Sequence, residues 1–119
     1  MNEDPIADWR EALEAETWYF IARGFGAQVT PLALEVEGEG AICVFSSPSL
    51  AESFGLAMGL DPTEVTQLLA IPALDAVDYL LGFLEDGVRS LVLDPGTRDS
   101  ALQLAALPHV RAWIADNPA

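Results

Sequence analysis

The stretch that decides the fold is residues 32–45, which read LALEVEGEGAICVF. Apolar residues alternate with mostly acidic ones up to Glu37, which predicts a strand that buries Leu32, Leu34 and Val36 and leaves its other face in water. The Gly38-Glu39-Gly40 sequence predicts a tight turn, because glycine reaches positive φ without strain. Residues 41–45 are almost entirely apolar and predict a second strand. We therefore expect an antiparallel hairpin.

The segment before the hairpin predicts a helix and then a strand. Asp4 and Pro5 are typical of a helix start, where proline's missing N–H has no partner to lose. Residues 17–23, TWYFIAR, are rich in strand-favouring residues, and both alternating sets are apolar. This pattern indicates a central strand covered on both faces. Gly24-Phe25-Gly26 is expected to end it in a turn.

The sequence after the hairpin predicts a second helix. Ser46, Ser47 and Pro48 supply a serine cap and a proline in the first turn. Gly59 stands where a glycine commonly ends a helix. The expected buried face carries Leu50, Phe54, Ala57 and Met58.

Residues 61–71 allow two interpretations. Asp61-Pro62-Thr63-Glu64 fits a capping box that opens a helix with Val65, Leu68 and Leu69 on one stripe. Alternatively, residues 64–70 form a strand. The strand is the favoured interpretation, mainly because of the family resemblance described below.

The remaining residues predict a helix, a strand and further helices. A helix over residues 73–86 is expected to bury Leu74, Val77, Leu81 and Leu84. Residues 88–93 predict a strand that ends at Asp94-Pro95-Gly96. Thr97 or Asp99 is then expected to cap a helical region that carries Leu102, Ala105 and Ala106. Pro108 is expected to interrupt this region before a last short helix.

These elements together predict an α+β fold. We expect a mixed, partly antiparallel sheet of about five strands with helices packed on it. The 119 residues are close to the commonest size of one domain, so residues 1–119 are expected to form a single domain. The order of elements differs from the regular alternation of a doubly wound nucleotide-binding fold.

The charge balance excludes two classes of partner. The chain has 5 basic residues, all arginine, and 19 acidic ones, for a net charge of −14 at pH 7. A field of this sign repels phosphate backbones and anionic lipids, so neither nucleic acid nor membrane is an expected partner. A basic protein or a cationic ligand is compatible with it. Solubility or adaptation to salt would also explain the acidity.

Cysteine usage and the N-terminus bear on the compartment. A single cysteine, Cys43, leaves no internal disulfide, which suits a reducing compartment. The acidic N-terminus lacks the basic start and apolar run of a secretory signal. A cytoplasmic location is therefore expected.

Residue types that carry catalysis are few. His109 is the only histidine and is expected to be structural, since a metal site or a general base needs further partners. Cys43 lies in the middle of an apolar strand and is expected to be buried. Three carboxylates, Glu35, Glu37 and Glu39, are compatible with a hard cation, but a solvated strand face is the favoured interpretation. We therefore predict no catalytic site, no metal site and no cofactor.

Two segments resemble a known family. Residues 41–54 read AICVFSSPSLAESF, and residues 87–97 read GVRSLVLDPGT. The chain is similar to the N-terminal domain of the bacterial SseB (enhanced serine sensitivity) family, whose members show a strand ending in Phe-Thr-Ser and a later strand ending in Asn-Pro-Gly-Ser. Ser46, Asp94 and Thr97 depart conservatively from those motifs. The resemblance implies a mixed α/β fold and a cytoplasmic bacterial protein, and it transfers no catalytic residue.

The turns that follow two of the strands are the candidate functional surface, although a purely structural turn followed by a helix cap is the favoured interpretation of the Asp94 turn. They consist of Asp94, Pro95, Gly96 and Thr97 in one turn and Phe45, Ser46 and Ser47 in the other. Both turns leave a strand toward a helix start, so we expect them to lie close together. The leading hypothesis is a non-enzymatic interaction or regulatory module that binds a protein partner, and homodimerisation is compatible with it. The alternative is a small-ligand or metal-binding domain that uses the same turns.

Overall fold

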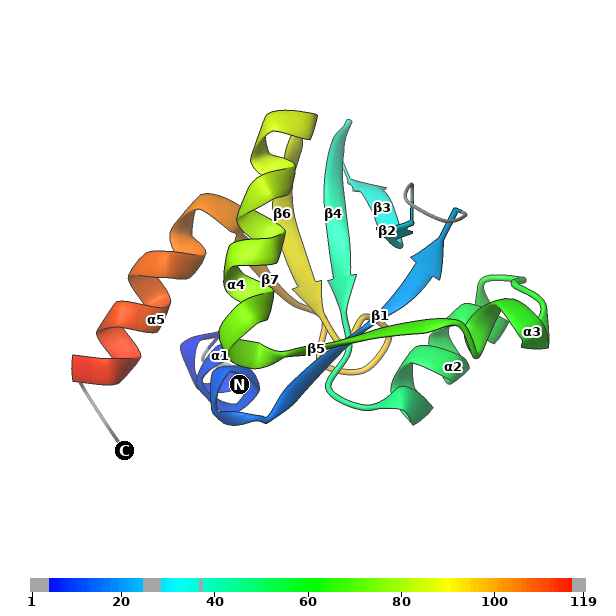
Figure 1. Cartoon of the computed structure of the whole chain (residues 1–119), viewed down its shortest axis with the longest axis horizontal. Helices are drawn as coiled ribbons and strands as arrows, with labels where there is room; N and C mark the ends of the chain where they lie inside the picture. Colours follow the sequence, from blue (N-terminus) through cyan, green and yellow to red (C-terminus); the bar gives the residue numbers. More distant parts are fainter. Residues whose placement is uncertain (1–4, 25–28, 37, 117–119) are drawn as a thin grey trace.

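The computed structural model describes residues 5–24, 29–36 and 38–116 of the chain. Its helices are α1 (Pro5–Glu14), α2 (Pro48–Ala57), α3 (Pro62–Val65), α4 (Ala73–Leu81) and α5 (Leu107–Asp116), with 3-10 helices η2 (Gly82–Asp86) and η3 (Leu104–Ala106). Its strands are β1 (Thr17–Arg23), β2 (Thr30–Pro31), β3 (Ala33–Val36), β4 (Glu39–Val44), β5 (Leu68–Pro72), β6 (Val88–Leu93) and β7 (Ser100–Gln103). The arrangement is an α+β fold, which confirms the predicted class (Figure 1).

The strands are distributed over two hydrogen-bonded sheets, a division that the sequence pattern does not reveal. One sheet has the order β2-β1-β5, and the other has the order β3-β4-β6-β7. β4 and β6 are parallel neighbours, while the other neighbouring pairs are antiparallel. The four-stranded sheet is therefore mixed, as expected, whereas the three-stranded sheet is entirely antiparallel. The described residues form seven strands in two sheets where one sheet of about five was predicted.

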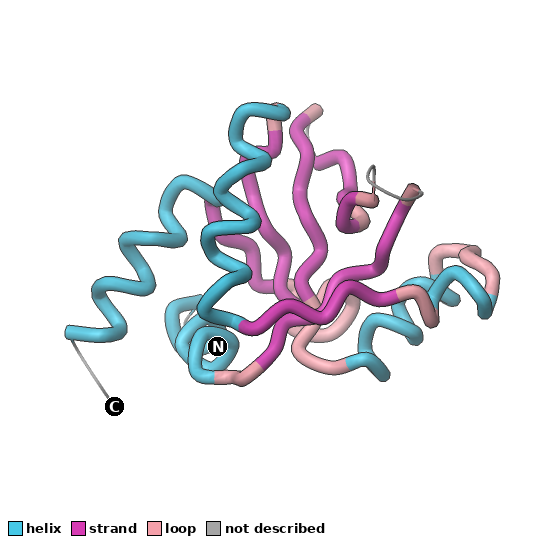
Figure 2. The backbone as a smooth tube through the Cα atoms, viewed as in Figure 1, coloured by secondary structure: helices cyan, strands magenta, loops and turns pink. Residues whose placement is uncertain are grey.

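Leu32 joins the two sheets. Its amide donates to the Ile21 carbonyl of β1 at 2.8 Å, and its own carbonyl accepts the Cys43 amide of β4 at 3.0 Å. Further along β1, Tyr19 and Phe45 exchange two backbone hydrogen bonds of 2.9 Å each. β1 and β4 therefore meet at Tyr19 and Phe45 and diverge around residues 30–36. We call this divergence the fork; Figure 2 shows β1 and β5 crossing near the end of β4.

The hairpin predicted at residues 32–45 is confirmed. β3 pairs with β4 in antiparallel register, with Leu34 opposite Ala41. Leu32 and Leu34 pack against core residues, while Glu35 is exposed. Gly38 has a φ of +83°, which the turn requires. The side chain of Val36, the whole of Glu37 and the predicted turn residues Phe25 and Gly26 lie outside the described residues.

The apolar core has two clusters on opposite faces of the strands. The larger one combines alternate residues of β1, β4 and β6, such as Phe20 and Ile42, with buried residues of α1, α4 and α5. The smaller one combines Ile21, Cys43 and Phe45 with Ala51 of α2. In β1, Trp18 and Phe20 pack in the larger cluster and Tyr19 and Ile21 in the smaller one, which confirms that both faces of this strand are covered. Figure 1 shows α1, α4 and α5 toward one end of the molecule and α2 and α3 at the other.

α4 presents a different face to the core from the one predicted. Its buried residues are Ala73, Ala76, Val77 and Leu80, which recur at helical spacing. Of the predicted stripe only Val77 is fully buried, and Leu74 is 78% exposed. The Ala73 amide donates to the Glu16 carbonyl at 3.0 Å, which ties the helix start to the end of α1. The two alanines let α4 approach the strands closely, so the small face and not the leucine-rich face turns inward.

α2 starts as predicted, but its buried face differs in part from the predicted one. The Ser47 hydroxyl accepts the Leu50 amide at 3.3 Å, which confirms the serine cap. Leu50 and Phe54 pack against the smaller core cluster, as predicted. Ala51 and Gly55 are buried, whereas Ala57 and Met58 are exposed, contrary to the prediction. A Cβ atom at Gly55 would lie 2.4 Å from Cγ1 of Val65. The close packing of α3 on Gly55 therefore determines which side of α2 faces the core.

Each interpretation of residues 61–71 holds for part of the segment. α3 begins with the Asp61 amide donating to Oε1 of Glu64 at 2.9 Å, as a capping box requires. β5 then follows and pairs with β1 in antiparallel register, with Leu69 opposite Phe20. The strand therefore begins at Leu68 and not at Glu64.

The predicted helix start at Thr97 or Asp99 is wrong, and Leu102 lies in a strand, whereas the predicted helical residues Ala105 and Ala106 lie in η3. Residues 100–103 form β7, which pairs with β6 so that Leu102 lies opposite Leu91. Asp94 and Asp99 both have positive φ, at 47° and 51°, and this turn reverses the chain into an antiparallel strand. Pro108 does not interrupt a helix, because it is the second residue of α5, where proline is tolerated. Among the described residues, no helix has both the length and the apolar character needed to cross a membrane.

Candidate partner-binding surface

The two predicted turns lie side by side, as expected. β4 and β6 are parallel and adjacent, with Val44 opposite Leu93, so the segments that follow them leave the same edge of the sheet. The Asp94 carboxylate accepts two hydrogen bonds from Ser46, one from its amide at 2.8 Å and one from its hydroxyl at 2.7 Å. The Asp94 amide donates to the Val44 carbonyl at 2.7 Å. Asp94 therefore fastens the end of β6 to the end of β4.

Much of the predicted site does not reach the surface. The side chains of Asp94 and Phe45 have no exposed area, and Pro95 is also buried. Gly96 is exposed, and Ser46 and Ser47 are half-buried. Thr97, also exposed, donates through its amide and its hydroxyl to the Asp94 carbonyl, each at 3.0 Å. Direct contact with a partner is therefore open only to the exposed residues of the two turns.

Arg98 links this pair of turns to α1. Its Nε atom lies 3.3 Å from Oδ2 of Asp94, and its other nitrogens pair with Glu11 and, at 3.5 Å, with Asp8. The hydrogen bond to Glu11, foremost, raises the pKa of Arg98 above its usual range, with smaller contributions from Asp94 and Asp8. Ser100 of β7 also donates to the Asp8 carboxylate. The sequence pattern gave no signal for this link, since its members are distant in the chain.

Two hollows flank the C-terminal end of α1. The first has a volume of about 200 Å³ and is lined by Glu11, Ala12, Ala15, Ser46, Leu93 and Arg98. The second has a volume of about 400 Å³ and is lined by Leu13, Glu14, Ala15, Glu16, Pro72, Ala73 and Leu74. Ala15 lines both, so the two hollows are neighbours, and we call them together the α1-end surface. Sequence reasoning missed it because it assigned Leu74 to the buried stripe of α4.

The α1-end surface combines an apolar side chain with negative charge. Leu74 is the most exposed of the large apolar side chains in the described part of the chain. Glu14 and Glu16 line the same hollow as Leu74 and are exposed, and the last turn of α1 holds no basic residue. Glu11 lines the neighbouring hollow, where it is paired with Arg98. Carboxylates at the C-terminal end of a helix lie at the negative end of its dipole, so they repel the helix end and attract a cation.

The described side chains that could bind a metal or act as a nucleophile lie apart from one another. Within residues 5–24, 29–36 and 38–116, no three His, Cys, Asp or Glu side chains are placed to hold a metal ion together. Glu35 and Glu39 are both exposed on the hairpin, and Glu37 lies outside the described residues. His109 is exposed on the first turn of α5. Cys43 is buried in β4, as predicted.

We expect the Cys43 thiol to be inert in the folded protein. Burial raises its pKa from about 9.0 to about 12, so at pH 8 it is protonated and covered. Labelling with an aromatic disulfide reagent at pH 8 should proceed only as fast as the protein unfolds, and rapidly in urea. Above pH 9 the unfolded chain loses this proton first, so the free energy of unfolding should fall as the pH rises from 9 toward 12. Rapid labelling of the native protein would contradict this assignment.

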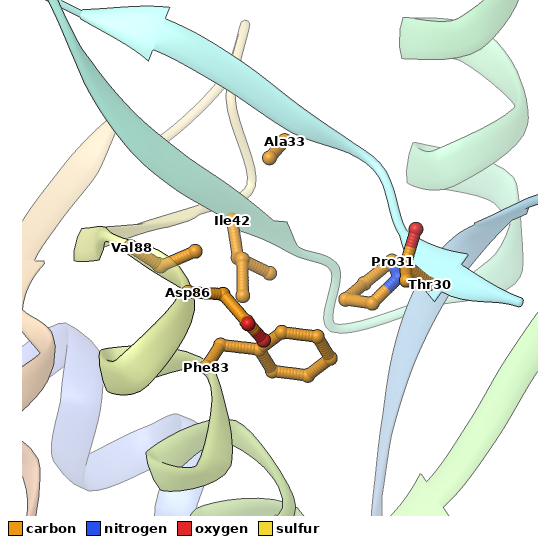
Figure 3. A pocket seen from close by; sticks show the side chains of 7 residues that line it. All are labelled: Thr30, Pro31, Ala33, Ile42, Phe83, Asp86 and Val88. Carbon is orange, nitrogen blue, oxygen red and sulfur yellow. The ribbon is translucent and has the colours of Figure 1, made fainter. Parts of the chain in front are cut away.

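A further pocket of about 400 Å³ lies in the fork, away from the α1-end surface. It is lined by Thr30, Pro31, Ala33, Ile42, Phe83, Asp86 and Val88. β2, β3 and β4 form one side of it, and η2 and the start of β6 form the other (Figure 3). We call it the fork pocket.

Comparison with known proteins adds no family assignment. No protein-family model matches the chain, and no curated protein is significantly similar to it.

Proposed function

We propose that this chain is a non-enzymatic interaction module of the bacterial cytoplasm, and that its α1-end surface binds a basic, partly apolar segment of a protein partner. The observation that carries the proposal is Leu74, which is 78% exposed at the edge of a 400 Å³ hollow bordered by carboxylates. The bacterial and cytoplasmic context follows the resemblance of residues 41–54 and 87–97 to the SseB family.

The apolar part of the surface favours contact with a partner side chain. Leu74 borders a hollow that also includes Leu13, Pro72 and Ala73, so an inserted apolar side chain would bury both itself and Leu74. Burying one leucine-sized side chain stabilises a complex by about 2 kcal/mol. An apolar anchor beside a polar rim is the usual composition of an interface.

The charged part of the surface selects the kind of partner. Glu14 and Glu16 border the apolar residues, and the whole chain carries a net charge of −14. Lysine or arginine side chains of a partner would be attracted to these carboxylates and to the carbonyl end of α1. A second copy of the chain would present the same acidic surface, and repulsion between like charges disfavours homodimerisation here.

The turns themselves are less suited to a ligand. The Asp94 carboxylate already accepts two hydrogen bonds from Ser46 and pairs with Arg98. A ligand at this point would have to displace bonds that hold β4 and β6 together. This argument favours the interaction module over a ligand site at the turns.

Affinity capture with matched variants tests the proposal. The immobilised protein is incubated with extract of its native cells, next to Leu74→Ser and Leu56→Ser. Leu56 is 44% exposed on α2, at the other end of the molecule, so its variant is a control for the loss of an exposed leucine. We expect a partner whose affinity falls about tenfold with Leu74→Ser and stays unchanged with Leu56→Ser.

The dependence of binding on salt, and on the carboxylates of the surface, provides a second test of the proposal. A basic partner should bind more weakly at high salt, because salt screens the carboxylates. Replacing Glu14 and Glu16 together by glutamine should reduce the same salt dependence. The proposal would be refuted by a partner that binds the Leu74→Ser variant with the same affinity as the wild-type protein. It would also be refuted if no partner bound at low salt.

A further inference from the structure

We propose that the fork pocket is a binding site for a small organic cation, an amine with an apolar aromatic or branched body. The proposal is independent of the α1-end surface, since the two sites share no lining residue. It rests on the shape of the pocket, the fixed position of its aromatic wall and its single type of charge.

The pocket exists because the fork exposes one face of the hairpin. Residues 30–36 leave β1 at Leu32 to pair with β4, so Pro31 and Ala33 stand apart from η2 across an open space. Ile42 forms part of the apolar wall and is almost fully buried. A volume of about 400 Å³ lies within the range of small-molecule sites and is lined mainly by apolar side chains.

The aromatic wall is held in place by neighbouring rings. Phe83 lies edge-to-face with Tyr79, with 5.3 Å between the ring centroids, and Tyr79 lies against Phe20 at 6.1 Å. Phe20 is fully buried, so this row of rings anchors Phe83 to the core. A wall fixed before binding reduces the entropy that a ligand must overcome.

The charge of the pocket is negative. Among the described residues that line the pocket, Asp86 alone is charged, and Figure 3 shows its carboxylate directed toward the space between Ile42 and Phe83. Two arginines lie on neighbouring segments, and each has its own partner. Arg23, opposite Thr30, pairs with Glu64 at 2.8 Å and lines a different hollow. Arg89 donates to the Leu84 carbonyl at 3.3 Å and also lines a different hollow. The net charge of −14 adds attraction for a cation and repulsion for an anion. An apolar amine therefore complements the pocket, with its body against Phe83 and its ammonium at Asp86.

An NMR titration with matched probes tests the site. Phenethylamine, 2-phenylethanol and 3-phenylpropionate have similar apolar bodies and carry a positive, a zero and a negative charge. We expect phenethylamine to shift the amide signals of Ala33 and Val88 saturably, with a dissociation constant in the millimolar range. It should bind about threefold more tightly than the alcohol, because the mouth of the pocket is open to solvent and screens the ion pair. The propionate should bind most weakly.

Three variants separate the charge from the cavity. Asp86→Asn should reduce the amine to the affinity of the alcohol, whereas Asp78→Asn, which removes an exposed charge of α4 outside the pocket, should leave the preference intact. Ala33→Phe should fill the pocket and abolish binding of both; because Ala33 is exposed, this variant should still fold. Should Ala33→Phe fail to fold, the Asp86 and Asp78 pair decides the question. Equal binding of amine and alcohol to the wild-type protein, shifts confined to residues outside the pocket, or undiminished binding to folded Ala33→Phe would each overturn the proposal.

Discussion

Replacing Asp94 with alanine is expected to destabilise the protein by about 3 kcal/mol, through the loss of buried hydrogen bonds and the strain of alanine at positive φ. The Asp94 side chain has no exposed area and accepts both the amide and the hydroxyl of Ser46. Its φ of 47° lies in the left-handed region, which aspartate tolerates better than alanine. Urea unfolding followed by tryptophan fluorescence measures the change.

Two further variants identify the source of the effect. Asp94→Asn keeps one acceptor for the Ser46 amide and tolerates the same φ, but it loses the pairing with Arg98, so we expect a loss of about 1 kcal/mol. Ser46→Ala removes only the hydroxyl bond and should cost about 1 kcal/mol as well. If Asp94→Ala were no less stable than Asp94→Asn, the hydrogen bonds of Asp94 would not be what holds the ends of β4 and β6 together.

Replacing Gly55 with alanine is the second change with a large expected effect. Alanine normally stabilises a helix interior by about 1 kcal/mol relative to glycine. At Gly55 the new Cβ would lie 2.4 Å from Cγ1 of Val65 and 3.3 Å from Cδ1 of Ile21. Val65 is fully buried, so it has no room to move away. We therefore expect a net loss of about 2 kcal/mol in the free energy of unfolding.

The chain contains a matched control for this prediction. Gly82, at the end of α4, has a helical φ of −61°, and a Cβ there would meet no atom within 4 Å. Gly82→Ala should therefore stabilise the protein by about 0.5 kcal/mol. Val65→Ala should cost less in the Gly55→Ala background than in the wild-type protein, because it relieves the overlap. Additive losses in that double variant would show that the overlap is not the cause.

The parts of the fold that rest on local pattern were predictable. Alternation in residues 32–36 and the glycines after them identified the hairpin, and Ser47-Pro48 identified the start of α2. β7 was missed because SALQ lacks the β-branched and aromatic residues that favour strands, and only its pairing with β6 makes it one. The inward face of α4 was missed because apolar residues surround the helix, and tertiary packing selects the alanine face.

The candidate site was likewise predictable only in part. The proximity of the Asp94 and Ser46 turns was predicted from their place after apolar strands, although the helix start expected after Asp94 is strand β7 in the structure. The burial of Asp94 was not, since it depends on Ser46 and Arg98 as partners. The α1-end surface joins residues 11–16 to residues 72–74, and no sequence pattern links such distant segments.

The hydrogen bonds between Asp94 and Ser46 also have a consequence for folding kinetics. They join residues 48 positions apart, and the parallel pairing of β4 with β6 spans a similar length of chain. Closing a loop of that length costs chain entropy before any contact repays it, so local hairpins such as β3–β4 and β6–β7 are the natural early structures of folding. The Asp94 bonds form only after β4 and β6 have met. We therefore expect Asp94→Ala to speed unfolding more than it slows folding, which unfolding and refolding rates measured in urea would test.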